Sequence, residues 1–470
     1  MSGFKRSLGL WDATMLVAGS MIGSGIFIVS AGMLRDLGSP AWTLVAWVVA
    51  GLLTVMAALS YGELAGMMPK AGGQFVYLQR AYGKLTAFLY GWTAFTVITS
   101  GIIAAVAVAF AKFSAVFFPV LSPDNILFDL GFVKVSAAQV YAVSTIILLS
   151  LFNTRGVQSS KTLTTIFTTA KIAALLALII VGLAVGLDTD VLATNFSTGW
   201  QAATTGSDGV ITPLTGVALL SVLGVAMVGS LFSSDGWNSI TFIAGEVKEP
   251  QRNIPRSLAL GTLIVTGLYV LANITYLALL PSEGIMNAEA DRVGTAAAQV
   301  IMGPAAVSVM AILIMISTFG CINGYVLVGP RMYYAMAKEG LFFKQAGALS
   351  KRGVPQWAMW LQCIWSCILC FSGTYGDLLD YATFASLLFY IVTIIGIFIL
   401  RKREPDAERP YKAVGYPWIP ALYIVCALAF CLNLLVFKPT FTIGSLVIVG
   451  LGAVVYFVTM RSGAKEASAN

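Results

Sequence analysis

The chain has no histidine and little charge of either sign. Only 10% of its 470 residues are Asp, Glu, Lys or Arg, whereas soluble globular chains carry about 25%. Hydrophobic residues make up 58% of the chain, and the mean hydropathy is +0.87. A water-soluble enzyme and a disordered scaffold are therefore excluded. The lack of histidine also excludes a histidine-ligated metal site and a histidine proton relay.

Cysteine is scarce, and every cysteine lies inside an apolar run, where it behaves as a small hydrophobic residue. We expect packing rather than chemistry from all six, which are Cys321, Cys363, Cys367, Cys370, Cys426 and Cys431. No nucleophile–base pair or cluster of metal-ligating side chains supports a catalytic role. We therefore expect no enzyme, no metal site and no cofactor.

Long apolar runs fill most of the chain. About 20 apolar residues cross a bilayer as a helix, and the hydropathy predicts an all-α polytopic membrane protein with twelve transmembrane helices. Residues 1–470 then form a single transmembrane domain joined by short loops. The first run lacks the cleavage site of a signal peptide and is expected to be retained. The predicted spans are 11–36, 41–67, 84–118, 135–152, 160–186, 214–246, 257–281, 305–336, 355–374, 378–400, 416–437 and 440–460.

Basic residues are distributed unevenly between the two sides of the predicted membrane. Twelve spans put both termini on one side, and most of the 28 Lys and Arg residues fall there. Lys171 lies within a span, and the opposite side carries Arg35, Lys112, Lys134, Arg292 and Lys438. The positive-inside rule therefore predicts a multi-pass protein of the cell membrane, inner or plasma, with both termini in the cytoplasm. Because topology explains the basic clusters, we expect no nucleic-acid binding.

Two predicted spans carry residues that interrupt a helix. In the first, Gly23 and Gly25 flank Ser24 near the middle of the span, and a glycine there lowers helix stability by about 1 kcal/mol relative to alanine. Gly19 and Gly23 also form a GxxxG pattern, which is common where helices pack closely. The sixth span places residues 233–236, Ser-Ser-Asp-Gly, at membrane depth. An aspartate there is costly unless it faces water or a partner.

Interrupted spans in corresponding positions are typical of inverted-repeat transporters with broken helices. Spans 1–5 (11–186) would form the first repeat and spans 6–10 (214–400) the second, with spans 11 and 12 (416–460) appended. At each break, one half-helix exposes N–H groups, which suit a carboxylate, and the other exposes carbonyls, which suit an ammonium. Two such breaks can hold a zwitterion, so the expected ligand is an α-amino acid or a similar molecule.

Four ordered stretches of the chain resemble the amino acid–polyamine–organocation superfamily and, within it, the L-amino-acid transporter family. They are residues 19–27 (GSMIGSGIF), 61–83 (YGELAGMMPKAGGQFVYLQRAYG), 232–258 (FSSDGWNSITFIAGEVKEPQRNIPRSL) and 317–340 (STFGCINGYVLVGPRMYYAMAKEG). The similarity runs from about residue 7 to residue 435. It implies a twelve-span fold with a five-plus-five inverted repeat, broken helices 1 and 6, alternating access, and amino acid transport that is often obligatory exchange.

The resemblance also implies a substrate site, residue by residue. The family's carboxylate site corresponds to the backbone of Gly23, Ser24 and Gly25. Its ammonium site corresponds to carbonyl groups near Ile22, Phe232 and Ser233. Phe232 also matches an aromatic gate over bound substrate, and Asn323 matches a polar residue that lines the side-chain pocket.

Lys171 lies in the fifth predicted span, ten residues after Lys161. At 1.5 Å per residue it is roughly 15 Å deeper, about halfway across a core of ~30 Å. A lysine at that depth is a functional candidate, because its ammonium cannot reach either interface. The resemblance implies that Lys171 occupies the space where sodium-coupled relatives of the fold bind Na⁺. It would repel Na⁺ and could brace the carbonyls of the broken first helix.

Asp235 lies at a position that is small and uncharged in many members of the resembled family. An aspartate occurs there both in members that carry dibasic amino acids or cystine and in bacterial exchangers of small neutral ones. Three roles stay open. Asp235 contacts the substrate ammonium, pairs with an internal base such as Lys171, or titrates as a proton carrier.

These features predict a sodium-independent amino acid transporter, an exchanger of neutral L-amino acids that works by alternating access in the lipid bilayer. The alternatives are a proton-coupled or cationic amino acid carrier and, from another class, a membrane amino acid sensor. Heteromeric transporters of the resembled family use an external cysteine between spans 3 and 4. Residues 119–134 contain none, so we expect no disulfide-linked ancillary subunit.

Overall fold

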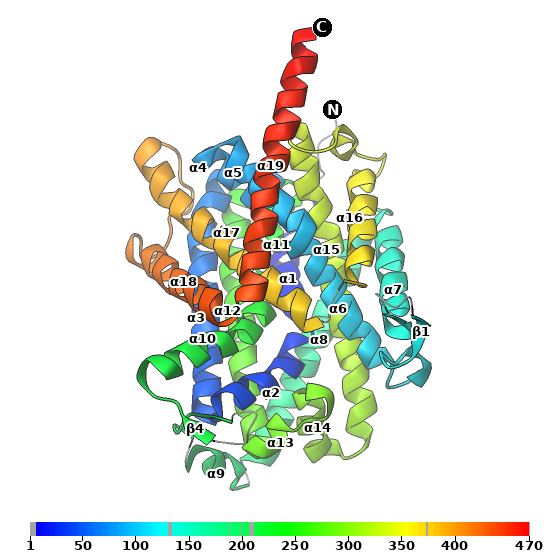
Figure 1. Ribbon diagram of the computed structural model, residues 1–470, viewed down its shortest axis with the longest axis vertical. Helices are drawn as coiled ribbons and strands as arrows, with labels where there is room; N and C mark the ends of the chain where they lie inside the picture. Colours follow the sequence, from blue (N-terminus) through cyan, green and yellow to red (C-terminus); the bar gives the residue numbers. More distant parts are fainter. Residues whose placement is uncertain are drawn as a thin grey trace.

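The computed structural model is an elongated bundle of helices with two small antiparallel hairpins (Figure 1). It describes residues 6–129, 134–187, 189–197, 199–205, 211–372 and 375–469, without the side chains of 157–164, 205, 375 and 460–469. The helices are α1 Leu10–Met21, α2 Gly25–Leu37, α3 Pro40–Met67, α4 Gln74–Tyr82, α5 Lys84–Thr93, a π-helical turn Ala94–Ile98, α6 Thr99–Ser114, α7 Ala137–Asn153, α8 Val157–Gly186, α9 Val191–Ser197, α10 Gly216–Ser233, α11 Ser239–Phe242, α12 Pro250–Leu279, α13 Ser282–Met286, α14 Val293–Met302, α15 Ala305–Lys338, α16 Gln356–Leu369, α17 Tyr375–Arg403, α18 Trp418–Phe437 and α19 Pro439–Ala469. The hairpins pair β1 (Ile126–Asp129) with β2 (Lys134–Ser136), and β3 (Ala203–Thr205) with β4 (Ile211–Pro213).

Length and composition identify the helices that can cross a membrane. Within the described ranges nine helices are long and apolar enough, or ten if α1 and α2 form one span bent by 41°. Each of the twelve predicted segments contains a helix. However, α7 has 17 residues and α16 has 14, fewer than the roughly 20 that a crossing normally uses. The chain is a multi-pass helical membrane protein, and the number twelve stays a prediction.

The sixth predicted span is interrupted more strongly than the sequence indicates. The prediction runs from 214 to 246, whereas α10 ends at Ser233 and continues only as the four-residue α11 and a 3-10 turn, Ala244–Glu246. Ser, Asp and Asn side chains between these pieces compete for backbone hydrogen bonds. Gly236 has a φ of 86°, a left-handed conformation that glycine adopts readily and that ends a helix.

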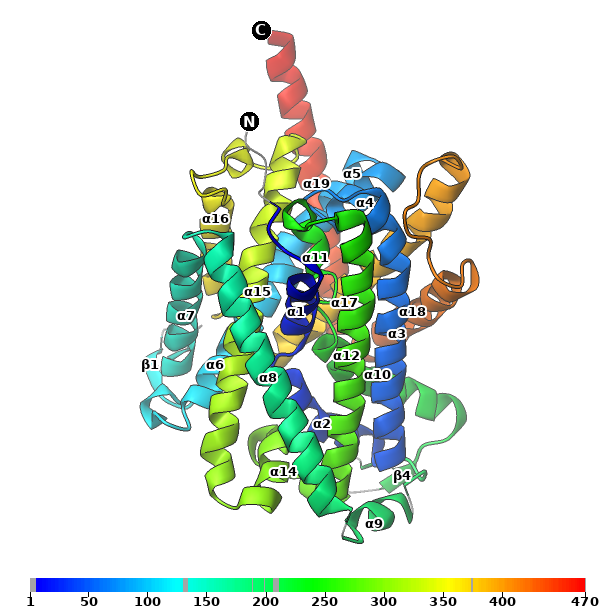
Figure 2. The same ribbon diagram turned by 180° about the vertical axis from the view of Figure 1, so that it is seen from behind.

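The broken first span lies inside the bundle. Figure 2 shows α1 flanked by α8, α12 and α15, and α1 packs against all three. Residues 13–21 of α1 are all buried, and α2 packs against α10, α13 and α14. Because the end of α1 is away from solvent, its last carbonyls need partners from other helices.

The two ends of the bundle carry different parts of the chain. Leu8 pairs with Val247 near the start of α12, and α19 leads the C-terminus out at the same end, which we call the terminal end (Figure 1, top). α9, α13 and α14 lie at the opposite end, which we call the far end. The far end also holds the loop before α7 and residues 289–292.

Candidate functional site

The two interrupted helices touch in the core at Gly25 and Ser233. α1 ends at Met21, Ile22 is extended with a ψ of 98°, and α2 begins at Gly25. A side chain on Gly25 would collide with Ser233, whose Cβ lies 2.9 Å from the position of the added carbon. Glycine is therefore required at position 25, because only a residue without Cβ lets the two breaks approach this closely.

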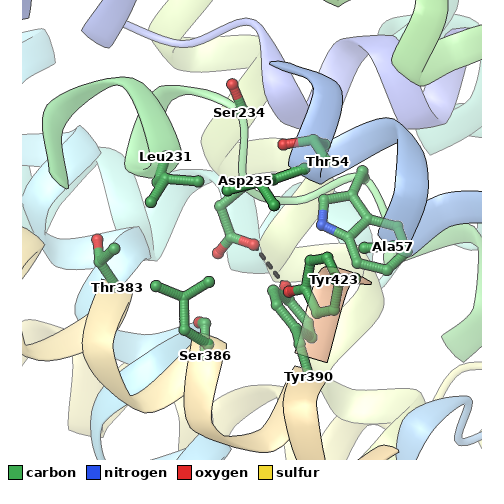
Figure 3. Close-up of a pocket in the computed structure, with 12 residues that line it drawn as sticks. Thr54, Ala57, Leu231, Ser234, Asp235, Thr383, Ser386, Tyr390 and Tyr423 are labelled. Carbon is green, nitrogen blue, oxygen red and sulfur yellow. Dashed lines mark hydrogen bonds between the residues drawn. The ribbon is translucent and has the colours of Figure 1, made fainter. Parts of the chain in front are cut away.

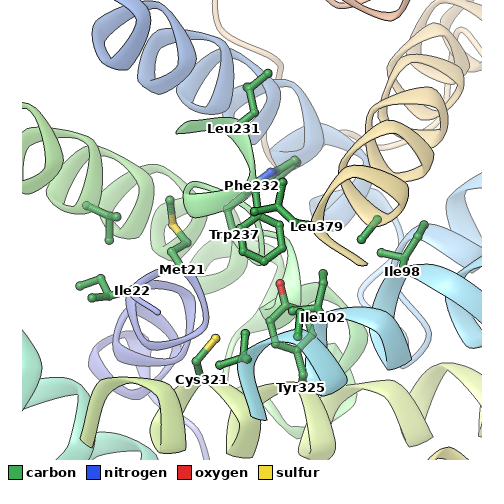
Figure 4. Packing of buried hydrophobic residues seen from close by; sticks show 14 of the residues in the cluster. Met21, Ile22, Ile98, Ile102, Leu231, Phe232, Trp237, Cys321, Tyr325 and Leu379 are labelled. Atoms are coloured by element: carbon green, nitrogen blue, oxygen red, sulfur yellow. The ribbon is translucent and has the colours of Figure 1, made fainter. Parts of the chain in front are cut away.

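A narrow cavity of about 20 Å³ lies where the breaks meet. Figure 4 shows Ile102, Cys321 and Tyr325 gathered on one side of Phe232. The lining residues are Ser20, Met21, Gly23, Ser24, Gly25, Ile102, Val106, Phe232, Ser233, Asp235, Cys321 and Tyr325. The structure thus brings most of the predicted substrate-binding residues together; Ile22 and Asn323 are the ones that do not line this cavity.

Lys171 lies in the core, only 2% exposed, where α8 crosses the break in the first span. Its Nζ donates to the carbonyl oxygens of Gly19 at 2.5 Å and Ile22 at 2.6 Å, both at the C-terminal end of α1. The partial negative charge of a helix C-terminus stabilises a cation there. The ammonium lies where the bracing role requires it, and its relation to sodium stays a prediction.

Three further side chains donate to the same stretch of backbone. The Ser317 hydroxyl lies 3.0 Å from Ile22 O and 3.2 Å from Gly23 O. Cys321 Sγ lies 3.3 Å from Ser20 O, and the Tyr269 hydroxyl lies 3.0 Å from Met21 O. Each carbonyl from residue 19 to residue 23 therefore has a donor on another helix.

This arrangement bears on the predicted ammonium site at Ile22. A carbonyl oxygen has two lone pairs, and that of Ile22 already accepts hydrogen bonds from Lys171 and Ser317. In this conformation the end of α1 is occupied by the protein's own donors.

The break after α10 carries an acid instead of a base. The Tyr390 hydroxyl of α17 donates to Asp235 Oδ1 at 2.5 Å (Figure 3). The Tyr269 hydroxyl lies 3.0 Å from Ser233 O as well as near Met21 O, so one phenol joins the two breaks. In the described part of the chain no ion pair forms between Asp235 and Lys171, whose ammonium is directed to α1. The predicted pairing with an internal base is absent from this conformation.

Asp235 also borders two further cavities. One, of about 20 Å³, lies between α3, α10, α17 and α18, and its lining includes the hydroxyl-bearing residues Thr54, Ser234, Thr383 and Ser386 (Figure 3). The other, also of about 20 Å³, extends toward Gln74 and Asn238. The carboxylate therefore borders the crossing of the breaks and two further small cavities.

Polar contacts close the bundle between Asp235 and the terminal end. Asn238 Nδ2 donates to Gln74 Oε1 at 3.2 Å, and Gln74 Nε2 donates to the Thr393 hydroxyl at 3.0 Å. Further out, Arg331 Nε lies 3.0 Å from Glu246 Oε1, with both side chains almost completely buried. A path from the cavity to the terminal end would require these contacts to break.

Asn323 lies on the other side of α15 from the cavity. Its side-chain oxygen accepts from Asn153 Nδ2 of α7 at 2.8 Å. Residues two apart in a helix differ by about 200° in direction, so Asn323 points away from the face that carries Cys321 and Tyr325. The predicted pocket-lining role of Asn323 does not hold for this cavity, where Cys321 and Tyr325 supply the wall.

The sequence interpretation missed the residues that hold the breaks in place. Ser317, Cys321 and Tyr325 follow one another at a spacing of four, which places them on one face of α15, and this pattern was a usable signal. No local pattern in the sequence marks Tyr269 or Tyr390. Among the described residues, no group of three or more His, Cys, Asp or Glu side chains could hold a metal ion.

The matches between this chain and known proteins cover the whole site. A family model described as amino acid permease matches residues 8–459. The large neutral amino acids transporter small subunit 2 of Homo sapiens is 31% identical over 459 residues, 97% of this chain and 80% of that protein. The serine/threonine exchanger SteT of Bacillus subtilis is 28% identical over 463 residues, 98% of either chain. The b(0,+)-type amino acid transporter 1 of Mus musculus is 28% identical over 437 residues, 93% of this chain and 84% of that protein.

Proposed function

The chain belongs to the amino acid permease family, and from this premise we propose that it is a sodium-independent exchanger of neutral L-amino acids. The family and the relatives named above are transporters of amino acids, not enzymes. The observation that carries the proposal is the cavity where two helix breaks meet in the core of a membrane-embedded bundle. Such a cavity offers both poles that a zwitterion needs.

The α-carboxylate would bind the first break. α2 begins at Gly25, so the N–H groups of its first turn and its partial positive charge are directed at the cavity beside Gly23 and Ser24. The α-ammonium would bind the second break, at the carbonyls of Phe232 and Ser233 and the carboxylate of Asp235. This assignment keeps the substrate ammonium away from Lys171, which would repel it.

The rest of the cavity favours a neutral side chain. Ile102, Val106 and the rings of Phe232 and Tyr325 form its apolar wall, and an apolar wall offers no partner to a charged group. Phe232 and Tyr325 are 8% and 7% exposed, so they cover the site as an aromatic gate would.

Sodium independence rests on Lys171. An ammonium bound to Gly19 O and Ile22 O occupies carbonyl oxygens that a sodium ion would otherwise use. Exchange by wild-type protein should therefore proceed equally in sodium, potassium and choline buffers. A large stimulation by sodium would refute this part of the proposal.

Alternating access would follow from two inverted repeats. In the proposed division α8 is the fifth span, and its Lys171 binds the helix break of the first span. α17 is the tenth span, and its Tyr390 contacts the helix break of the sixth span. The corresponding positions of these helices in residues 11–186 and 214–400 support the five-plus-five arrangement, with 416–460 appended.

A carrier of cationic amino acids, or one coupled to protons, is the second candidate. Asp235 is the observation that favours it, because its carboxylate borders the cavity and forms no ion pair with a Lys or Arg among the described residues. Such a carboxylate could bind a second substrate cation or a proton.

Counterflow in proteoliposomes tests the function. Labelled amino acid should accumulate in vesicles preloaded with unlabelled substrate, and a competition screen of the twenty amino acids identifies the class. Strongest inhibition by lysine and arginine would favour the cationic carrier, and a pH-driven uptake without internal substrate would favour proton coupling. Binding without any accumulation would show an amino acid sensor instead.

The proposed location is the cell membrane, with the terminal end in the cytoplasm. An impermeant maleimide should label Asp124→Cys in intact cells and Asp406→Cys only after permeabilisation, in a background where native cysteines stay unlabelled. The reverse pattern would invert the topology.

We expect this transporter to work without a disulfide-linked ancillary subunit, although the human relative carries the name small subunit. Residues 119–134 contain no cysteine, and residues 130–133 of this segment lie outside the described ones. The native protein should migrate identically on gels with and without reducing agent. A larger adduct that disappears on reduction would contradict this expectation.

A further inference from the structure

A fourth and much larger cavity lies at the far end of the bundle, away from the crossing of the helix breaks. It has a volume of about 770 Å³ and is partly open to solvent. Its walls come from α6, the loop and β-hairpin before α7, the start of α7 and residues 290–292. Lys112, Lys134 and Arg292 line it, against one acidic residue, Asp124.

These cations are only weakly neutralised. In the described residues Lys112 makes one hydrogen bond, to Ala290 O at 3.4 Å. Arg292 has a buried Nε without a hydrogen-bond partner, and its guanidinium lies 5.3 Å from the centre of the Phe113 ring. Lys134 lies 3.5 Å from Asp129 in a solvent-exposed pair, which contributes little.

Among the residues that line the cavity, three are cations and one, Asp124, is an acid. Asp291, which is bound to Arg35 at 2.8 Å, also attracts Lys112, and Glu289 attracts Arg292. Asp124 is exposed and hydrogen-bonded to the Ser122 hydroxyl. Within the described ranges, none of these acids forms an ion pair with Lys112 or Arg292.

Topology gives no reason for basic residues here. Membrane proteins keep lysine and arginine on the cytoplasmic side, and in the proposed topology only five of the 28 fall on the opposite side. Three of those five line one cavity although they come from separate elements. A concentration of charge against the general trend indicates that the cavity binds something negative.

The walls identify the kind of anion. Val108, Val116, Pro119 and Ile126 give the cavity an apolar side next to the cations. Guanidinium and ammonium groups together are the usual ligands of phosphate, and basic pockets between transmembrane helices bind anionic head groups. We propose that this cavity binds a phosphate group, carried by an anionic lipid of the adjacent leaflet or present as the free ion.

Thermal shift of the purified full-length protein in detergent tests the proposal. The probes are inorganic phosphate alone, a short-chain phosphatidylglycerol and the matching phosphatidylcholine, whose head group has no net charge. Stabilisation by phosphatidylglycerol alone assigns the site to a lipid. Stabilisation by inorganic phosphate as well assigns it to the free ion or both sources.

Substitutions separate this cavity from the rest of the surface. Arg292→Gln and Lys112→Gln should each weaken the apparent affinity for the anion at least tenfold. Lys134→Gln, at an exposed position that cannot disturb folding, should weaken it several-fold. Arg35→Gln removes the same charge at the same end but outside the cavity, and should leave the affinity unchanged. Equal stabilisation by both lipids, no stabilisation by any probe, or affinities that Lys134→Gln and Arg292→Gln leave unchanged would overturn the proposal.

Discussion

The breaks in the first and sixth spans border one cavity, but opposite charges accompany them. At the end of α1 an ammonium, that of Lys171, binds two carbonyls, and neighbouring donors cover the others from residue 19 to 23. At the end of α10 the chain supplies a carboxylate, Asp235, which accepts a hydrogen bond from the Tyr390 phenol. The first break is closed by the protein itself, whereas the second keeps a negative group at the cavity.

This difference assigns different tasks to the two breaks. A buried helix end with all its carbonyls hydrogen-bonded is fixed, because removing any donor leaves an unsatisfied buried group. A carboxylate beside a cavity, with no cation bound to it in the described structure, can still attract a cation from outside. We therefore expect the end of α1 to provide geometry, the start of α2 to bind the substrate carboxylate, and the second break to provide ammonium recognition.

Lys171→Ala should have the largest effect, because it removes the donor that fixes the first break. Two hydrogen bonds from a charged group, each worth about 1.5 kcal/mol or more, are lost, so counterflow should fall roughly a hundredfold while the protein still elutes as a folded species. Lys171→Met restores the volume without the charge and should be equally inactive. Wild-type counterflow rates in Lys171→Ala would show that the first break does not need Lys171 to fix its geometry.

The contact between the breaks can be tested with two glycines of one motif. An alanine at Gly25 would press against Ser233, whereas the nearest atom to an added carbon at Gly23 is Cys321 Sγ at an ordinary 3.5 Å. Overpacking costs about 1–3 kcal/mol, so Gly25→Ala should lower exchange about tenfold. Gly23→Ala should stay within about threefold of wild type. Equal effects of the two changes would show that the breaks need not touch.

Asp235→Asn tests recognition at the second break. If the carboxylate binds the substrate ammonium, the apparent KM for neutral amino acids should rise about tenfold or more, because a hydrogen bond to a charged group is worth about 1.5 kcal/mol or more. Any affinity for lysine or arginine should fall further. Counterflow at varied substrate concentration measures both.

The same variant distinguishes the other two roles of Asp235. If the residue is a proton carrier, Asp235→Asn should abolish the pH dependence of transport and spare pH-independent exchange. If it pairs with a buried base in another conformation, the main effect should be a loss of thermal stability, since breaking such a pair costs about 3–5 kcal/mol. An unchanged KM with an unchanged substrate profile would eliminate ammonium recognition.

Tyr390→Phe should have the smallest effect of these variants, and it separates the orientation of the Asp235 carboxylate from its charge. It removes the phenol that donates to Asp235 Oδ1 and leaves the charge in place. One hydrogen bond contributes about 1 kcal/mol, so the apparent KM should change by only about threefold to fivefold. A loss as large as that of Asp235→Asn would mean that the orientation of the carboxylate, rather than its charge, governs binding.

Much of the site could be predicted because the information is local in the chain. Gly23, Ser24 and Gly25 interrupt a helix wherever it folds, and Asp235 in an apolar run must find a cavity or a partner. Lys171 could be placed at mid-depth from helix rise alone. These properties depend on backbone geometry and on the free energy of transferring a segment from water into the membrane. Both act on each segment separately.

Other features depended on how the helices pack. Asn323 matched a pocket residue in the sequence, yet the rotation of α15 turns it to Asn153. Tyr269 became the link between the two breaks only because α12 crosses both of them. The interruption of the sixth span between α10 and α11 likewise includes the left-handed conformation of Gly236, which lies in the packed core.

The sequence by itself therefore determined that this protein spans a membrane, that two of its helices are interrupted, and that a base and an acid lie at the depth of the interruptions. Only the tertiary structure decided which of these groups is already hydrogen-bonded by the protein and which still faces the cavity. The physical reason is that hydropathy and helix propensity act along one segment, whereas the direction of a side chain and the donors that reach a carbonyl are set by the relative rotation of helices far apart in the chain.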